Sequence, residues 1–259
     1  MLLNGKVVVI HGAGGSVGTA VARAFAKAGA HVVLSGRSEA SLGRTLDAVR
    51  ATGGLGESVI ADAMDEDQVT AALASVRERH GRVDVSFNLV GLEDIHGLSM
   101  LELPYADFAR PIERAVRSHH LTATAAARVM DDGGALLALI ANCGRQPVGG
   151  VGGFGVACAA IEALWRQLAV ELGPRGIRTV CLLSAGSPDS AGLREVLEIH
   201  AANKGITLAD YERIAGEKSM LKRLPSLAEV ADAAVLFASD GARAMTGAVA
   251  NVTCGEIAD

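Results

Sequence analysis

Several features that would place this chain in a common class are missing from its sequence. No apolar stretch approaches the roughly 18 residues of a membrane-spanning helix, so we expect no membrane partner. The formal net charge of −5 gives no reason to expect a nucleic-acid partner. The first residues lead directly into a predicted strand, and we therefore expect no signal peptide.

Cysteine is sparse and scattered. The four cysteines form no CxxC pair and stand at Cys143, Cys158, Cys181 and Cys254. This pattern is typical of reduced thiols rather than of disulfides or zinc ligands. We therefore expect a cytoplasmic protein that holds no metal.

What the chain does have is a regular alternation of short apolar runs and helical patterns. The candidate strands are residues 6–11, 31–35, 57–61, 83–90, 134–140, 177–183 and 248–252. The candidate helices are residues 17–28, 39–51, 66–79, 106–130, 153–172 and 226–239. This alternation predicts a parallel sheet covered by helices on both faces. We expect one domain, residues 1–259, with a doubly wound, three-layer α/β fold of the Rossmann type and about seven strands.

Residues 187–224 interrupt the alternation with two short helical patterns where a single crossover would suffice. Ligands of open α/β sheets bind beyond the carboxyl ends of the strands. Because this segment follows the predicted strand 177–183, it is a candidate substrate lid. The alternative is a helical insertion without a role in binding.

A glycine-rich turn lies between the first predicted strand and the first predicted helix. It runs His11-Gly12-Ala13-Gly14-Gly15-Ser16-Val17-Gly18. Glycines let a pyrophosphate approach the backbone, and the helix N-terminus offers amide N–H groups and the positive end of its dipole. The strand–turn–helix context favours a dinucleotide site over a simple tight turn.

The end of the second predicted strand indicates which dinucleotide to expect. NAD sites usually have Asp or Glu there for the ribose 2′-hydroxyl, whereas this chain has Arg37. A guanidinium suits a 2′-phosphate in charge and geometry, which favours NADP over NAD as the cofactor. The alternative is a solvated surface arginine, with Glu39 close by in the sequence.

Two further strand ends carry polar candidates for the nucleotide site. Asp62 follows the third predicted strand, where it can hydrogen-bond an adenine amino group or cap the next helix. The fourth predicted strand ends with Asn88, followed by Gly91.

Together these residues resemble the short-chain dehydrogenase/reductase family over essentially the whole chain. The glycine turn is similar to the TGxxxGxG of the single-domain branch, with His11 at the threonine and Ser16 at the middle glycine. Its glycines 12, 15 and 18 also satisfy the TGxxGxxG of the extended branch, whose members are normally longer. The resemblance favours the single-domain branch, in which homo-oligomers, tetramers or dimers, are common.

Two other segments carry the same resemblance. The stretch from Asn88 to Gly91 is similar to the family's NNAG. Residues 185–190 are similar to PGxxxT, with Gly186 at the glycine and Ser190 at the threonine that usually meets the nicotinamide amide. The family resemblance thus implies a nucleotide cofactor held by the glycine turn and by these strand ends.

The resemblance also implies a hydride transfer coupled to proton transfer by an Asn, Ser, Tyr and Lys tetrad. In this chain those four positions are occupied by Ala115, Ala141, Phe154 and Cys158. No lysine occurs between Lys27 and Lys204, and neither Tyr105 nor Tyr211 is followed by a lysine four residues later. Phenylalanine has no proton to give, so the usual acid–base catalysis, worth about 10²–10⁴-fold, is not available.

Three nearby residues are candidates to substitute for the tetrad. Asn142 can hydrogen-bond a carbonyl group or merely cap a strand end. His119, one helical turn beyond Ala115, is either a replacement acid or a packing residue, or it forms an oligomer contact. Cys158 is either a reactive thiol or a small buried filler.

Three functions follow from this pattern. The first is an NADP(H)-dependent oxidoreductase with a non-standard site for a small-molecule substrate. The second is a cofactor-binding sensor or regulator without dehydrogenase activity. The third is a degenerate subunit that stabilises an active relative.

Overall fold

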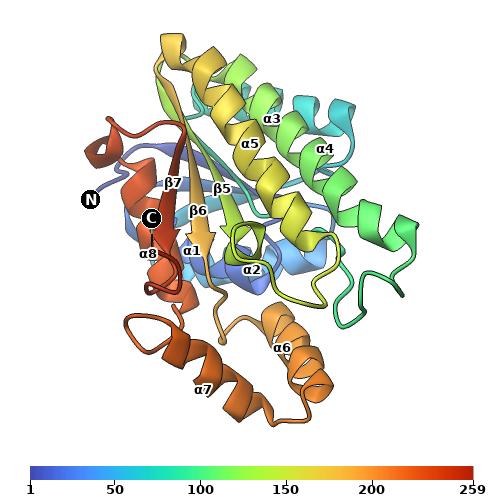
Figure 1. Cartoon of the computed structure of the whole chain (residues 1–259). Coiled ribbons are helices and arrows are strands. Elements are labelled where there is room, and N and C mark those ends of the chain that lie inside the picture. Colours follow the sequence, from blue (N-terminus) through green and yellow to red (C-terminus); the bar gives the residue numbers. More distant parts are fainter. Residues whose placement is uncertain (259) are drawn as a thin grey trace.

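The protein has a seven-stranded parallel sheet, as the sequence predicts. The computed structural model describes residues 1–258, and its strands follow the order β3-β2-β1-β4-β5-β6-β7 (Figure 1). The strands are β1 (Val7–His11), β2 (His31–Gly36), β3 (Leu55–Ile60), β4 (Val85–Asn88), β5 (Gly134–Ala141), β6 (Ile177–Ser184) and β7 (Ala248–Val252). β1 pairs with β2 on one side and with β4 on the other, so the strand order reverses at β1, and α/β sheets bind their ligands at the carboxyl ends of the strands at such a point.

Helices cover both faces of the sheet. The helices are α1 (Ser16–Lys27), α2 (Glu39–Arg50), α3 (Glu66–His80), α4 (Tyr105–Val129), α5 (Phe154–Leu172), α6 (Ala191–Asn203), α7 (Leu208–Lys218) and α8 (Leu227–Ala238). Short 3-10 turns stand at η1 (Asn142–Gly144), η2 (Gly173–Arg175) and η3 (Asp240–Ala242). One hydrophobic core lies between the sheet and α3, α4 and α5, and a second lies between the sheet and α1, α2 and α8. These layers confirm the predicted Rossmann-type architecture.

The fourth strand is shorter than the sequence predicts. Residues 83–90 are apolar enough for a strand, yet β4 ends at Asn88. There the side-chain Oδ1 atom of Asn88 accepts a hydrogen bond from the Val90 backbone N–H at 2.9 Å. A side chain that bonds the backbone two residues ahead turns the chain out of the sheet.

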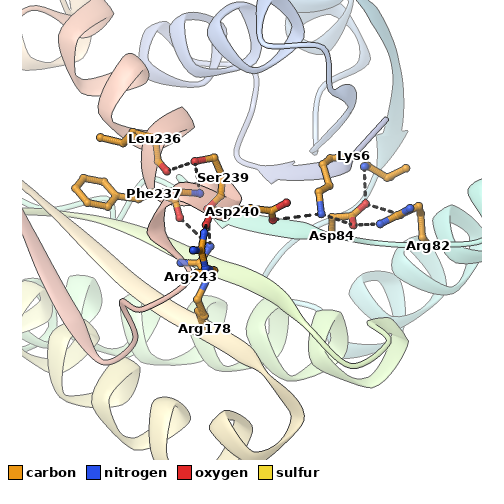
Figure 2. Close-up of polar contacts among 11 residues, drawn as sticks. Lys6, Arg82, Asp84, Arg178, Leu236, Phe237, Ser239, Asp240 and Arg243 are labelled. Carbon is orange, nitrogen blue, oxygen red and sulfur yellow. Dashed lines mark hydrogen bonds and ion pairs between the residues drawn. The ribbon is translucent and has the colours of Figure 1, made fainter. Parts of the chain in front are cut away.

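Buried and half-buried charges meet at the amino ends of the central strands (Figure 2). Asp84 accepts a hydrogen bond from the Val7 backbone N–H at 2.8 Å and pairs with Arg82 and Lys6. Arg178, on β6, donates to the carbonyl oxygens of Phe237 and Ser239. Each buried polar group in this network has a partner, so this end of the sheet is closed off by its own side chains.

The two short helices predicted within residues 187–224 are α6 and α7. Figure 1 shows them beyond the carboxyl ends of β5 and β6, away from the two helical layers. The side-chain Nδ2 of Asn203 donates to the carbonyl oxygen of Gly97 at 2.8 Å. This contact ties α6 to the long loop between β4 and α4.

Candidate functional site

The glycine turn is packed tightly against the protein itself. Gly12 has a φ of +76°, and a Cβ there would lie 2.6 Å from the Leu89 carbonyl oxygen. A Cβ on Gly18 would lie 2.6 Å from the Ala13 carbonyl oxygen, and one on Gly14 would collide with Ser41. These three glycines are therefore required by internal packing, whatever the turn binds.

Gly15 is different because it faces open space. No atom of the described residues lies within 4 Å of a Cβ built on it, and it is the N-cap residue of α1, with no side chain capping the helix. The first-turn amide N–H groups after Gly15, at Ser16, Val17 and Gly18, thus have no side-chain acceptor from the cap. An anion fits this place, in both space and electrostatics.

A pocket of about 170 Å³ lies beside the turn, at the carboxyl ends of β1 to β4. Its lining includes Gly12, Arg37, Asp62 and Gly91, all of which the sequence singled out. Asp62 Oδ1 accepts from the Met64 N–H, and α3 is capped by Asp65 instead. The capping alternative for Asp62 is therefore wrong.

Arg37 does not stand alone in this pocket. Its guanidinium lies 3.8 Å from the carboxylate of Glu93, which also pairs with Arg114 at 2.9 Å. The Arg114 Nε atom is buried and has no hydrogen-bond partner within residues 1–258. Neither Arg114 nor Glu93 carries a sequence signal of its own, although each is close in sequence to a candidate position, Ala115 and Gly91.

The side chain of Asn88 forms its hydrogen bonds within the protein. Its side-chain Nδ2 donates to Thr122 Oγ1 at 2.9 Å, while Oδ1 accepts from the Val90 N–H. Only 2% of Asn88 is exposed. Asn88 therefore leaves little for a ligand to hydrogen-bond.

A second space, of about 220 Å³, continues past the helix N-terminus toward β6. Val17, Gly186 and Ser190 are part of its lining. The hydroxyl groups of Ser16 and Ser190 lie 3.1 Å apart, and they join the glycine turn to the segment after β6. Gly186 has a φ of +89°, a conformation that favours glycine.

A central cavity of about 350 Å³ contains most of the remaining sequence candidates. Ala141, Phe154, Cys158 and His119 all line it, and the other walls are mainly aliphatic side chains such as Leu139. The remaining tetrad position, Ala115, is fully buried behind the cavity. The three pockets follow one another along the carboxyl edge of the sheet.

His119 presents an unused nitrogen at this cavity. Its Nδ1 bonds the carbonyl oxygen of Ala115 at 3.0 Å, while its Nε2 is buried and has no partner in the described part of the chain. Burial lowers the pKa of His119 to about 4, so the imidazole is neutral at pH 7. With Nδ1–H as the donor, Nε2 is a hydrogen-bond acceptor.

Cys158 is buried with its sulfur against the same cavity. The Ala141 backbone N–H donates to Sγ at 3.4 Å. A hydrogen bond from the Cys143 thiol lowers the pKa of Cys158, and burial opposes this shift. Asn142, the third candidate substitute, is turned elsewhere, because its side chain bonds the Glu256 carboxyl group.

Comparisons with known proteins agree with the fold. Residues 12–256 match the family described as Enoyl-(Acyl carrier protein) reductase. The enoyl-[acyl-carrier-protein] reductase [NADH] 1 of Rhizobium meliloti (strain 1021) is 32% identical, over 98% of this chain and 91% of that protein. The chain belongs to the short-chain dehydrogenase/reductase family.

Two solved structures extend the comparison. A short-chain type dehydrogenase/reductase from Mycobacterium marinum has a TM-score of 0.84 at 26% identity, covering 99% of this chain and 97% of that chain. The NAD+-bound xylitol dehydrogenase has a TM-score of 0.91 at 23% identity, covering 98% and 100%, and shows the fold alone. Short-chain dehydrogenases/reductases are NAD(P)-dependent oxidoreductases, and this protein is a member of that family.

Polar residues that the sequence analysis did not name also reach the central cavity of this short-chain dehydrogenase/reductase. Asp94 and His96, from the loop after β4, line it, and His200 from α6 contacts His96. No sequence signal joins a loop residue to one 104 positions later; only the fold brings the two together. No helix within residues 1–258 is long and apolar enough to cross a membrane.

Proposed function

We propose that this protein is an NADP(H)-binding oxidoreductase-family protein whose central cavity holds an apolar small molecule. The observation that carries the proposal is the set of three adjoining pockets: the pocket beside Arg37 shares Gly91 with the central cavity, which in turn shares Phe154 with the space toward β6. When bound, the reduced nicotinamide supplies a hydride equivalent to the cavity.

The residues present fit such a dinucleotide. The open space at Gly15 and the uncapped first turn of α1 suit the pyrophosphate. Gly186 and Ser190 would stand beside the nicotinamide end, and Asp62 beside the adenine. The unpartnered Nε of Arg114 is a donor that the protein leaves unused.

The preference for NADP rests on the charges around the adenosine pocket. Arg37 and Arg114 both approach the carboxylate of Glu93, and neither forms an ion pair with Asp62, the other acidic residue of the lining. A dianionic 2′-phosphate suits two guanidinium groups better than a ribose hydroxyl does. The names of the relatives argue the other way, since one acts with NADH and one structure holds NAD+.

A second candidate function is a sensor that binds NADP(H) without turnover. The observation that favours it is the apolar character of the tetrad positions: Ala141, Phe154 and Cys158 face the cavity without a charge or an acidic hydroxyl. His119 is neutral at pH 7 and accepts hydrogen bonds, so it is suited to hold a ligand hydroxyl rather than to act as an acid. A subunit that only stabilises an active relative would not need an open anion site at Gly15.

We further propose that residues 1–259 form one domain in which α6 and α7 act as a lid, and that the chain forms a homo-oligomer. Leu193 and Val196, both on α6, line the central cavity. Val116 on α4 and Val170 on α5 are exposed, which supports pairing through these helices. Light scattering after size-exclusion chromatography measures the assembly, and a monomer at micromolar concentration would contradict it.

Isothermal titration calorimetry tests whether the protein binds a dinucleotide and which one it prefers. The ligands are NADPH, NADH, and the fragments 2′,5′-ADP and 5′-AMP, which differ by the 2′-phosphate. We expect NADPH and 2′,5′-ADP to bind at least 10-fold more tightly than NADH and 5′-AMP. Arg37→Ala should remove that difference, while Arg44→Ala, an exposed arginine on α2, should keep it. Equal affinity for both fragments would overturn the NADP preference, and no binding of either dinucleotide would overturn the function.

A further inference from the structure

Asp94 and His96 form a polar end of the mainly apolar central cavity, and this end lies next to the side chain that replaces the family's tyrosine. The centroid of the His96 ring is 5.8 Å from that of the Phe154 ring. Aliphatic side chains of Leu89, Leu92 and Ile161 form other parts of the lining. A cavity with apolar walls and few polar groups orients its ligand through those groups.

The polar end is a chain of three side chains. His96 Nε2 hydrogen-bonds the Asp94 carboxylate, and His96 Nδ1 lies 3.2 Å from His200 Nε2. Only 6% of the His96 side chain is exposed, and 20% of that of Asp94. An Asp–His pair fixes the orientation of the imidazole ring and stabilises the imidazolium that forms during proton transfer.

The chain continues through α6 toward α7. The His200 ring stacks on Tyr211, with centroids 6.2 Å apart, and the Lys204 ammonium lies 5.0 Å from the centre of the Tyr211 ring. Burial lowers the pKa of His200, as do the nearby His96 and Lys204. Of these groups, His96 and His200 are buried, and buried titratable groups that contact one another concentrate at functional sites.

We propose that His96, oriented by Asp94 and reprotonated through His200, is the proton donor of this cavity for an apolar ligand that carries a carbonyl oxygen. The proposal rests on the oxidoreductase function above. As the carbonyl carbon accepts a hydride, the oxygen gains an electron pair. That pair forms an O–H bond while the Nδ1–H bond of the imidazolium breaks and leaves its electrons on nitrogen.

The lid is part of this step. Delivery from Nδ1 requires His200 to give up its hydrogen bond to His96, and His200 belongs to α6. When α6 moves back and the hydrogen bond re-forms, His200 transfers the next proton to the Nδ1 atom of His96. His119 also lines this cavity, but its Nε2 is buried and is not assigned a part in this step.

The test uses 4-nitrophenol, an apolar ring whose visible spectrum reports the protonation of its oxygen. We expect the wild-type protein to bind it with a changed ionised fraction relative to the free probe at the same pH. His96→Gln and Asp94→Asn should still bind the probe but return the ionised fraction of the bound probe to that of the free probe. His120→Gln, an exposed histidine on α4, should behave as wild type.

Turnover of NADPH with medium-chain ketones and enoyl thioesters gives the second measurement. We expect His96→Gln to lower kcat by about 10²–10⁴-fold while the KM and the NADPH Kd change less than 2-fold. His200→Gln should lower kcat less, because solvent can still reprotonate His96 slowly. A purely structural role for His96 would instead raise KM and Kd together and lower the melting temperature.

Two results would overturn the proposal. One is an equal spectrum of bound 4-nitrophenol in wild type and His96→Gln; the other is no binding to the wild-type protein. Because this arm needs no nucleotide, it decides the role of His96 even if NADPH fails to bind, which would refute only the proposed function. Circular dichroism melting shows whether each variant folds, and Asp94→Asn replaces His96→Gln if the latter does not.

Discussion

The two ends of the parallel sheet differ in what their buried polar groups contact. At the amino ends, Asp84 is satisfied by Val7, Arg82 and Lys6 (Figure 2). At the carboxyl ends, by contrast, buried nitrogens of Arg114 and His119 have no partner within residues 1–258. His31 Nε2, at the start of β2, is the exception among the amino ends. The difference teaches that the polar groups of Figure 2 are satisfied by the protein itself, whereas two at the other end keep a nitrogen without a partner, next to the pockets in which we propose that a ligand binds.

The largest effect is expected from supplying the cavity with the family's own proton donor. In the His96→Gln background, adding Phe154→Tyr and Cys158→Lys should raise NADPH-dependent ketone reduction by about 10²-fold or more. The hydroxyl group would enter the cavity at the ring position of Phe154. Stopped-flow absorbance of NADPH measures the rate, and a rate equal to that of His96→Gln would show that position 154 does not face the reacting oxygen.

The next largest effect is expected from removing Asp84 at the amino ends of the strands. Asp84→Ala leaves the Val7 N–H without its acceptor and two cations without their shared carboxylate. We expect the free energy of unfolding to fall by about 3 kcal/mol, because a buried network loses one member. The Kd for NADPH should stay within 2-fold of wild type. Urea unfolding measures the free energy of unfolding, and calorimetry measures the Kd. A large loss of NADPH affinity would show that the two ends of the sheet are energetically coupled.

A pH effect follows from the two histidines at the open end. Burial lowers the pKa values of His11 and His119 from 6.5 to about 4. Between these pH values the unfolded chain binds protons that the folded protein excludes, so stability falls as the pH falls. The wild-type protein should therefore lose about 2 kcal/mol more of its free energy of unfolding between pH 7 and pH 5 than His119→Gln does. Urea unfolding of both proteins at both pH values measures this difference. An equal pH dependence in the two proteins would mean that water solvates His119 and that its pKa is not lowered.

The sequence predicts the sheet, both helical layers and the two helices between residues 187 and 224, because hydrophobic periodicity and glycine turns are local. The sequence also predicts that Ala141, Phe154 and Cys158 lie together, because Ala141 ends a strand and the other two begin the helix that follows it. It does not find Arg114 beside Arg37, or His200 beside His96, since these pairs are made by packing between distant elements. The orientation of Asn142 toward Glu256 was equally out of reach, because it depends on the C-terminal segment.

The smallest effect separates packing from binding within the glycine turn itself. Gly18 is fixed by the Ala13 carbonyl oxygen, so its presence says nothing about a ligand, whereas Gly15 has open space around it. Gly15→Val should lower the free energy of unfolding by only about 1 kcal/mol, because the extended backbone of Gly15 accepts a side chain although valine is a poorer N-cap than glycine. The same change should weaken NADPH binding at least 10-fold, or about 1.4 kcal/mol, since the isopropyl group would fill the space of the pyrophosphate. Gly43→Ala, on α2 with open space around it, is the matched control and should leave the Kd unchanged. If Gly15→Val binds NADPH as wild type does, the turn is a packing motif, and the anion site lies elsewhere along the carboxyl edge.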